Sequence, residues 1–476
     1  MGDEIVKSQF SKSDYERFFQ HLSDETEALK KLFEQQRFSP NLAMCGLEQE
    51  AWIVDKQFRP APENQFLLQQ MQSPLLSPEL ARFNIELNVT PQLLSGSGLQ
   101  QIHAELQNLW LQCEQVLSNQ SLDMQMIGIL PTVEDSDFTL ENMSEMNRYR
   151  ALNEQVLKSR NGSPIRLNIV GMEHLKRMHD DVMLESAATS FQIHRQVPPE
   201  QSARYYNAAV FLSPITVAVS ANSPLLFEKL LWQETRIPLF EQAVEVGGYG
   251  NAAHGPIRRV TFGSGYVKEN VLECFQENLA HYPVLLPVDL GKVEKQFAHL
   301  RMHNGTIWRW NRPLIGFDDD GIHIRVEHRV VSAGPSLIDE MANAAFFYGL
   351  QEYFATQSIA PETLLNFSTV KNNFYSAAQH GLTHSITWFD DKKISIQNLV
   401  GQELLEKSRQ GLEQLCVNSA LIENYLGIIQ QRVEKNRTGS RWQQLYVEKH
   451  GRDMQQLCAQ YWENQQSGIP VHEWNI

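Results

Sequence analysis

The chain has 476 residues and carries 41 Lys and Arg against 56 Asp and Glu, a formal net charge of −15. This acidic balance argues against nucleic acid as a partner, because proteins that neutralise phosphates need a basic surface. No run of about eighteen apolar residues occurs, so we expect no membrane partner either. The length is about three times a ~150-residue domain, which permits two or three domains or one large enzyme domain with an appended part.

The cysteines and the N-terminal sequence predict a cytoplasmic protein. The five cysteines are far apart and never form a C-x-x-C pair, so neither a disulfide framework nor a structural zinc site is predicted. Reduced thiols are typical of the cytosol. The N-terminal sequence has no apolar segment behind a basic start, so it does not resemble a secretion signal.

Residues 1–40 are predicted to form an N-terminal helical arm. Ser13 is the expected N-cap, and Glu16, three residues later, would complete a capping box. Residues 41–360 alternate short strand patterns with helical patterns, such as the apolar positions between Leu99 and Leu117. We expect this part to be an α+β catalytic domain.

A further helix is expected from Ile338 to Phe354, because Ser336 and Asp339 form a helix-start signal in front of it. Residues 361–476 are predicted to be mainly helical, with long amphipathic stretches rich in Gln and Glu. No linker separates them from the preceding residues, so we assign them to the same catalytic unit.

Four segments predicted to be strands alternate apolar residues with polar residues that bind metals or phosphates. Side chains two positions apart in a strand lie on the same face, so each segment would present its polar set together. The polar positions are Glu48 and Glu50 in residues 46–52, Asn84, Glu86 and Asn88 in residues 83–89, Gln192 and His194 in residues 191–194, and His323, Arg325, Glu327 and Arg329 in residues 322–329.

A solvated sheet face is the commoner reason for such alternation in any single strand. Solvated faces usually favour Thr, Lys and Ser, whereas these four strands supply four carboxylates and one imidazole. Carboxylates gathered on one face would repel one another, and bound Mg²⁺ or Mn²⁺ would remove that repulsion. Carboxylates with a single histidine also suit these ions better than zinc. The predicted metal ligands are Glu48, Glu50, Glu86, His194 and Glu327.

Such a face would serve either two-metal hydrolysis or phosphoryl transfer from a nucleotide. The residues themselves leave that choice open. No G-x-x-x-x-G-K-[ST] phosphate loop is present, and the glycine clusters at 96–98 and 263–265 fit neither the dinucleotide-binding fingerprint nor a G-x-S-x-G nucleophile elbow.

At these four strands the sequence resembles the glutamate-cysteine ligase type 2 family of carboxylate-amine ligases, in the glutamine synthetase-like superfamily. The family's G-x-E-x-E strand is similar to residues 46–50, its second carboxylate strand to 84–86, its Q-x-H strand to 192–194 and its E-x-R strand to 327–329. Smaller similarities lie at Arg148-Tyr149, Arg312 and Asn373. The shared order extends over about residues 44 to 382.

The resemblance implies an α+β fold with a curved antiparallel sheet, metals on its concave face, helices on the other face and a helical C-terminal part. It also implies an ATP-dependent ligase that converts a carboxylate into an acyl phosphate, which an amine then attacks to form an amide. Glutamate activated at its γ-carboxylate, with cysteine as acceptor, is the leading pair, which is the first step of glutathione biosynthesis. The expected partners are therefore a small carboxylic acid and an amine, with ATP and Mg²⁺ or Mn²⁺; homo-oligomer formation is left open.

Arginine binds carboxylates and phosphates through two parallel hydrogen bonds, so arginines near the motifs are candidates for substrate and ATP contacts. By position in the family motifs, the expected metal ligands are the five residues given above. The other expected roles are catalytic for Arg329, Glu50 and Glu327, ATP-binding for Arg312, Arg309 and Asn373, and substrate-binding for Arg148, Tyr149 and Arg236.

Two positions depart from the family pattern. Arg195 follows the histidine where relatives usually have a small or apolar residue, and Gln379 stands where many relatives have Arg. Two other classes of function stay open beside the ligase. A metal-dependent hydrolase would use the same carboxylates without ATP, and a catalytically silent ligase-like protein would only bind a metabolite.

Overall fold

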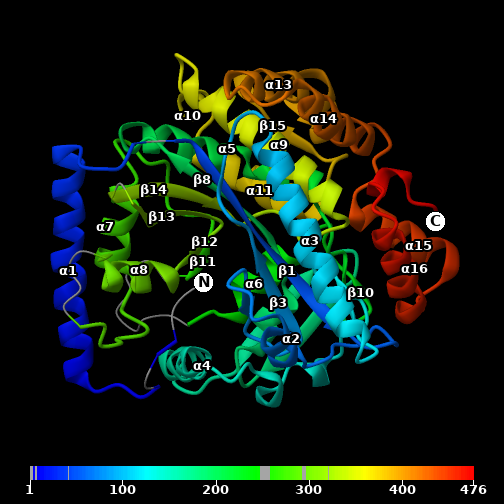
Figure 1. The fold of residues 1–476 in the computed structure, drawn as a ribbon, viewed down its shortest axis with the longest axis horizontal. Coiled ribbons are helices and arrows are strands. Elements are labelled where there is room, and N and C mark those ends of the chain that lie inside the picture. Colours follow the sequence, from blue (N-terminus) through cyan, green and yellow to red (C-terminus); the bar gives the residue numbers. More distant parts are fainter. Residues whose placement is uncertain (1–3, 6–7, 41, 247–257, 292–295, 320) are drawn as a thin grey trace.

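The computed structural model describes residues 4–5, 8–40, 42–246, 258–291, 296–319 and 321–476. Its centre is an eight-stranded, curved antiparallel sheet (Figure 1). The strand order is β13-β14-β8-β1-β3-β2, and the short strands β4 and β5 pair with the two ends of β1. These strands are β1 (Met44–Val54), β2 (Leu76–Pro78), β3 (Asn84–Asn88), β4 (Gln92–Leu93), β5 (Asp123–Gln125), β8 (Phe191–Val197), β13 (Asn311–Asp318) and β14 (Gly321–His328).

Within the described ranges, four two-stranded sheets lie outside the central one. Three are antiparallel hairpins, and β11 pairs with β12 in parallel. Their strands are β6 (Ile165–Val170) with β7 (His174–His179), β9 (Leu225–Leu226) with β10 (Lys229–Leu230), β11 (Val260–Thr261) with β12 (Trp308–Arg309), and β15 (Ser385–Thr387) with β16 (Lys393–Ser395).

Three helices cover the apolar face of the central sheet: α3 (Gly98–Ser118), α5 (Ser202–Val219) and α9 (Leu337–Thr356). Helix α5 is buried all round, as expected of a helix in the middle of a large core. The Tyr348 hydroxyl of α9 donates to the backbone oxygen of His194 at 2.9 Å, so α9 lies directly beneath β8. The α+β class and the curved antiparallel sheet are therefore confirmed.

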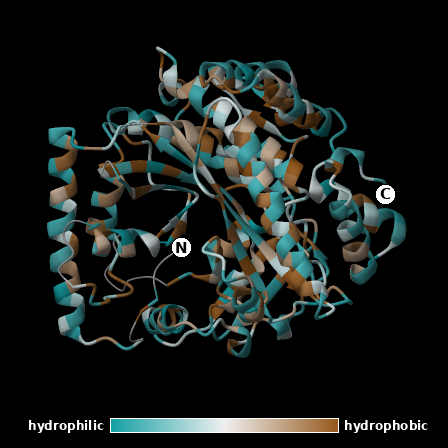
Figure 2. Cartoon of the chain, viewed as in Figure 1, coloured by the Kyte–Doolittle hydropathy of each residue, from teal (hydrophilic) through white to brown (hydrophobic). Residues whose placement is uncertain are grey.

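The C-terminal part is mainly helical and packs on α9 through α13 and α14. Arg432 of α14 donates to Asp339 Oδ1 at 2.7 Å, and both side chains are buried. In Figure 2 peripheral helices such as α1 carry both hydrophilic and hydrophobic residues, as amphipathic helices covering a core do. These helices are α10 (Pro361–Leu364), α11 (Phe367–His380), α12 (Ile396–Leu399), α13 (Leu405–Gln414), α14 (Ser419–Glu434), α15 (Gly439–His450) and α16 (Met454–Gln466).

The remaining helices lie near the N-terminal half of the chain and around the polar face of the sheet. Glu25 of α1 accepts hydrogen bonds from His299 Nδ1 and the Leu300 backbone at 2.8 Å, which fastens α1 to the start of α8. Among the described residues, no helix combines the length and the apolarity needed to cross a membrane. The helices are α1 (Lys12–Gln35), α2 (Asn64–Met71), α4 (Asn147–Ser159), α6 (Arg236–Ala243), α7 (Leu272–His281) and α8 (Ala298–Gly305).

The predicted start of the first helix was wrong by two residues. The N-cap of α1 is Ser11, and the capping box is completed by Asp14, whose carboxylate accepts from the Ser11 backbone at 2.8 Å. The sequence contains two overlapping capping patterns, at 11–14 and 13–16, and only the first is used. The expected helices at Leu99–Leu117 and Ile338–Phe354 are confirmed as α3 and α9, with Ser336 as the N-cap of α9.

Candidate active site

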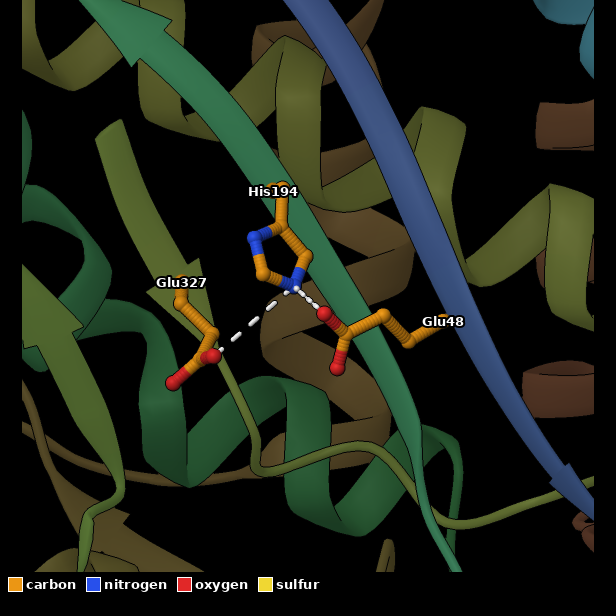
Figure 3. A group of neighbouring side chains, drawn as sticks. All are labelled: Glu48, His194 and Glu327. Carbon is orange, nitrogen blue, oxygen red and sulfur yellow. Dashed lines mark ion pairs between the residues drawn. The ribbon is translucent and has the colours of Figure 1, made fainter. Parts of the chain in front are cut away.

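Two carboxylates and an imidazole from three neighbouring strands meet on the polar face of the sheet. In the antiparallel register Glu327 of β14 lies opposite His194 of β8, and Glu48 of β1 points to the same face (Figure 3). His194 Nε2 lies 3.3 Å from Glu48 Oε1 and 3.8 Å from Glu327 Oε1. One ligand atom from each residue falls within 4.8 Å of the others, which is close enough to share a cation. We call these three residues the first acidic group.

A second group lies beside the first and consists of Glu50, Glu79 and Glu86. Glu50 of β1 is directly opposite Glu86 of β3, and Glu79 follows β2, which pairs with β3. Their carboxylate oxygens also lie within 4.8 Å of one another. The five predicted metal ligands are thus gathered on one face, divided between two groups, and joined by Glu79, which the sequence did not predict.

The electrostatics of the two groups differ. Burial raises the pKa of Glu327, but the charges of Arg312, Arg329 and His194 outweigh it and hold the pKa below its usual value. Likewise, burial opposes ionisation of Glu48, but His194 lowers its pKa overall. The first acidic group therefore holds its negative charge in the folded protein.

In the second group the carboxylates repel one another. Burial, opposed by Arg329 but assisted by the charge of Glu86, raises the pKa of Glu50 to about 7. Burial and the charge of Glu86 raise the pKa of Glu79 well above its usual value, and burial with the charge of Glu48 raises that of Glu86. This group therefore requires a cation if all three carboxylates are to be ionised at neutral pH.

The donor atoms fit a hard divalent cation. Glu48 Oε2, Glu79 Oε1 and His194 Nδ1 are buried and have no hydrogen-bond partner among the described residues. Buried polar atoms are rarely left unpaired unless a ligand, water or ion completes them. Five carboxylates and one imidazole form an oxygen-rich donor set, which suits Mg²⁺ or Mn²⁺.

Two arginines hold the Glu327 carboxylate in place. Arg312 of β13 donates to both its oxygens, at 2.8 and 2.9 Å, in the bidentate geometry that guanidinium groups favour. Arg329, just after β14, lies 3.4 Å from Glu327 Oε2 and also donates to Gln192 Oε1. Gln192 in turn donates to Glu50 Oε1 at 2.8 Å, so one hydrogen-bonded chain links Arg329 with both acidic groups.

Both groups open into one cavity of about 530 Å³. Apolar side chains line part of it, including Phe275, Leu286, Leu290, Leu314 and Ile315. A cavity of this volume with an apolar part and a few convergent charged groups is typical of a small-molecule site. Its charged and aromatic lining residues are Glu48, Glu50, Glu79, Glu185, Glu327, Arg148, Arg301, Arg312, Arg325, Arg329, Tyr149, Phe275 and Trp308.

The structure brings most of the predicted site residues to this cavity. Arg148 and Tyr149 lie in its wall, on α4, and Arg148 donates to the Tyr149 hydroxyl at 2.7 Å. Arg236 is fully buried in the wall of an adjoining cavity of about 20 Å³, where it donates to Glu234 Oε1 at 3.1 Å.

Two predicted ATP contacts lie elsewhere. Arg309 is buried against α7, where its guanidinium donates to Asn278 Oδ1 at 2.7 Å, and it is not in the cavity wall. Asn373 of α11 binds the backbone of Thr387 through both its side-chain atoms, at 2.7 and 3.1 Å. Both side chains are engaged in packing the fold, which sequence position alone did not indicate.

The two departures from the family pattern also lie away from the acidic groups. Arg195 alternates with His194 and therefore points to the helix-covered face, where it pairs with Glu352 and lies 4.7 Å from the Tyr205 ring centre. Gln379 lies near the end of α11 and is not in the wall of the main cavity. Neither side chain alters the surroundings of the acidic groups.

Several cavity residues escaped the sequence prediction. Glu79 and Glu185 lie outside the regular strands, where no alternation marks them. Arg325 lies in the cavity wall. The strand alternation could have indicated it, because it shares the polar face of β14 with Glu327. Arg301 of α8 also lines the cavity, and its signal was weak because most arginines on helices are solvated.

Comparisons with known proteins agree with this geometry. The fold is similar to a glutamate–cysteine ligase from Francisella tularensis, solved in complex with AMP, with a TM-score of 0.54 and 11% identity over 90% of each chain. It is also similar to a bifunctional glutathione synthetase from Pasteurella multocida, with a TM-score of 0.50 and 13% identity over 89% of this chain and 52% of that one. At these identities the likeness concerns the fold. No curated protein sequence matches significantly.

The family assignment comes from the sequence as a whole. The family model described as glutamate-cysteine ligase family 2 matches residues 44–460, which is most of the chain and includes every strand of the central sheet. The match confirms the predicted class of enzyme, an ATP-dependent carboxylate-amine ligase. The chain belongs to the glutamate-cysteine ligase family 2.

Proposed function

We propose that the chain joins the γ-carboxylate of glutamate to the amino group of cysteine, using ATP and Mg²⁺ or Mn²⁺. The observation that carries this proposal is the pair of acidic groups in one cavity, linked through Gln192 to the guanidinium of Arg329. Phosphoryl transfer requires cations around the charge that builds up, and this cavity offers places for them.

The residues proposed to hold divalent cations are the two acidic groups. Glu48, His194 and Glu327 would form one site, and Glu50, Glu79 and Glu86 the other. When bound, such cations neutralise the negative charge of the ATP phosphates and of the donor carboxylate. The raised pKa values of the second group support this assignment, because a cation would remove the repulsion that causes them.

Arg329 is proposed to stabilise the phosphoryl group during transfer. Its contacts with Gln192 and Glu327 fix the direction of the guanidinium, which keeps further N–H groups for a phosphate. Burial lowers the pKa of Arg329, but the charges of Glu327, Glu50 and Glu48 raise it overall, so it stays a cation throughout. Arg312 would act indirectly, by holding the Glu327 carboxylate in one orientation.

The proposed reaction has two steps. An oxygen of the donor carboxylate forms a bond to the γ-phosphorus of ATP, the P–O bond to ADP breaks, and an acyl phosphate results. The neutral amine of the acceptor then attacks the acyl carbon, the C–O bond to phosphate breaks, and the nitrogen loses a proton as the amide forms. Both steps build up negative charge near Arg329 and the acidic groups. The Arg329 guanidinium and the divalent cations proposed for these groups would stabilise that charge.

The remaining cavity residues are proposed to bind the rest of the substrates. The apolar part formed by Leu286, Leu290 and Leu314 would receive the adenine base, and Arg301 and Arg325 lie in the same wall as candidates for its phosphates. Arg148, Tyr149 and Arg236 are the candidates for the substrate carboxylates.

Glutamate and cysteine are the proposed substrates because the chain belongs to a family named for them and shares its fold with a glutamate–cysteine ligase. The reaction is proposed to take place in the cytoplasm as part of glutathione biosynthesis. All five cysteines are free, which accords with a reducing compartment.

The test is to measure ADP formation with Mg²⁺ and ATP against a panel of acids, each with and without a panel of amines. We expect release of ADP that depends on both glutamate and cysteine and that is lost in Glu50→Gln and Glu327→Gln. If another pair supports turnover, only the substrate assignment is wrong. If no pair raises ADP release above the level of the variants, the ligase proposal is overturned.

A further inference from the structure

Glu185 is an acidic residue of the cavity wall that belongs to neither acidic group. It lies in the 3-10 helix Met183–Ala187, between β7 and β8. Its side chain lines the main cavity and also the adjoining cavity of about 20 Å³, whose wall includes Glu50 and Arg329. Every other acidic residue among the described lining of the main cavity is a member of one of the two groups.

The charge of Glu185 is not balanced within the described part of the chain. No hydrogen bond or ion pair there reaches its carboxylate; Glu50 repels it and Arg329 attracts it from a distance. Arg329 is already engaged by Glu327 and Gln192. Burial, followed by the charge of Glu50, raises the pKa of Glu185 to about 8. The ionised form of this half-buried carboxylate is unfavourable without a cation, so a positively charged ligand beside it would bind favourably.

A metal ion shared with the acidic groups does not account for Glu185. The three ligand atoms of each group lie within 4.8 Å of one another, and the carboxylate of Glu185 falls in neither set. A cationic group on a substrate is the alternative. Aliphatic amines enter at neutral pH mainly as ammonium ions, because their pKa values lie at or above about 8.

We propose that Glu185 binds the ammonium group of the acceptor amine and positions its nitrogen beside the acyl carbon, which the nitrogen attacks as the neutral amine after releasing one proton to water. This proposal rests on the ligase function proposed above. The donor carboxylate is an anion, so its place is with Arg329 and the cations of the acidic groups. Glu185 lines the same small cavity as Arg329, next to the point where the acyl carbon would lie. The donor glutamate also carries an ammonium group, but that nitrogen lies four bonds from the reacting carboxyl carbon. The acceptor is therefore the reactant whose ammonium group must reach the acyl carbon itself.

Steady-state kinetics of Glu185→Gln with the acid and amine found in the panel test the proposal. Loss of one charge-assisted hydrogen bond should raise the KM of the amine about tenfold or more, with the KM values of ATP and the acid unchanged. Glu185→Asp keeps the charge and should recover part of the amine affinity. Asp180→Asn, an exposed acidic residue just before the same 3-10 helix and outside both cavity walls, is the matched control and should leave the KM of the amine unchanged.

Hydroxylamine separates the two halves of the reaction, because it is uncharged near neutral pH and traps an acyl phosphate as a hydroxamate. Glu185→Gln should form hydroxamate from the acid and ATP at the wild-type rate, even though amide formation is impaired. A matching loss of hydroxamate, or a raised KM for the acid, would mean that Glu185 serves the donor and would overturn the proposal. If the wild type forms neither hydroxamate nor amide with any acid, the ligase function itself fails, and this proposal with it.

Discussion

Glu50 of β1 lies directly opposite Glu86 of β3, and Glu79 brings a third carboxylate to the same point. Glu50 and Glu86 are buried and Glu79 is half-buried. The pKa of each is raised, by loss of solvent in every case and by a neighbouring carboxylate. Packing three acids together costs folding free energy unless a cation joins them. Substitutions of Glu50 and Glu86 can therefore test whether this group binds a cation.

Divalent cations should stabilise the fold through this group. A ligand that binds only the folded state at 100 times its Kd adds about 3 kcal/mol, so Mn²⁺ should raise the Tm measured by scanning fluorimetry. Glu86→Gln should raise the Tm of the metal-free protein, because it removes repulsion, and should reduce the shift caused by Mn²⁺. The exposed Glu141→Gln is the control. An undiminished Mn²⁺ shift in Glu86→Gln would contradict the metal assignment.

The free energy of unfolding of the metal-free protein should depend on pH through the titration of Glu50. Its pKa is raised from 4.5 to about 7 on folding, so the folded state binds the proton more tightly than the unfolded state. The stability that Glu50 contributes is full below pH ~4.5 and is lost as pH rises to about 7, a change of about 3 kcal/mol. Urea unfolding with a chelator should show this loss in the wild type relative to Glu50→Gln. A difference between the two proteins that does not vary over this range would contradict the assignment.

The metal-ligand candidates followed from strand periodicity, whereas the curved antiparallel sheet was implied by the family resemblance. Because alternate residues share a face, the sequence predicted that Glu48, Glu50, Glu86, His194 and Glu327 would lie together, and the antiparallel register places them so. What the pattern could not supply was the division into two groups. That division depends on which strands are neighbours, which is a property of the sheet order and not of any one strand.

The residues that sequence reasoning missed or misplaced share a physical reason. Glu79 and Glu185 lie in segments without periodicity, and only the folded chain brings them to the cavity. Arg309 has the chemistry of a phosphate ligand, but its guanidinium is engaged by Glu277 and Asn278. Whether a polar side chain faces a ligand or closes a packing contact is decided by tertiary structure, which composition and spacing do not reveal.

Two glutamates on opposite faces of the sheet, Glu327 and Glu352, should separate catalysis from stability. Glu327→Gln should lower the rate of ADP formation about 100-fold or more, because it removes a charge beside the transferred phosphoryl group. Glu352→Gln weakens the pair with Arg195 on the helix-covered face and should lower the Tm while leaving the rate within a few-fold. Equal losses of activity in both variants would show that a general loss of structure is responsible.

Glu79 should act as a metal ligand although no motif marks it. Glu79→Gln should raise the Mg²⁺ concentration required for half-maximal activity by 10- to 100-fold, an effect of about the size found when metal-site partners are removed. Glu63→Gln, an exposed residue before α2, is the control. A Mg²⁺ requirement equal to that of the wild type would exclude Glu79 from the site.

The most direct test of the central claim follows an oxygen atom through the reaction. The wild type is incubated with Mg²⁺, ATP, cysteine and glutamate labelled with oxygen-18 in its γ-carboxylate, and the released phosphate is analysed by mass spectrometry. An acyl-phosphate ligase transfers one labelled oxygen to each phosphate as the amide forms, and we predict this result. Phosphate released without label, or released in the absence of glutamate, would contradict the account.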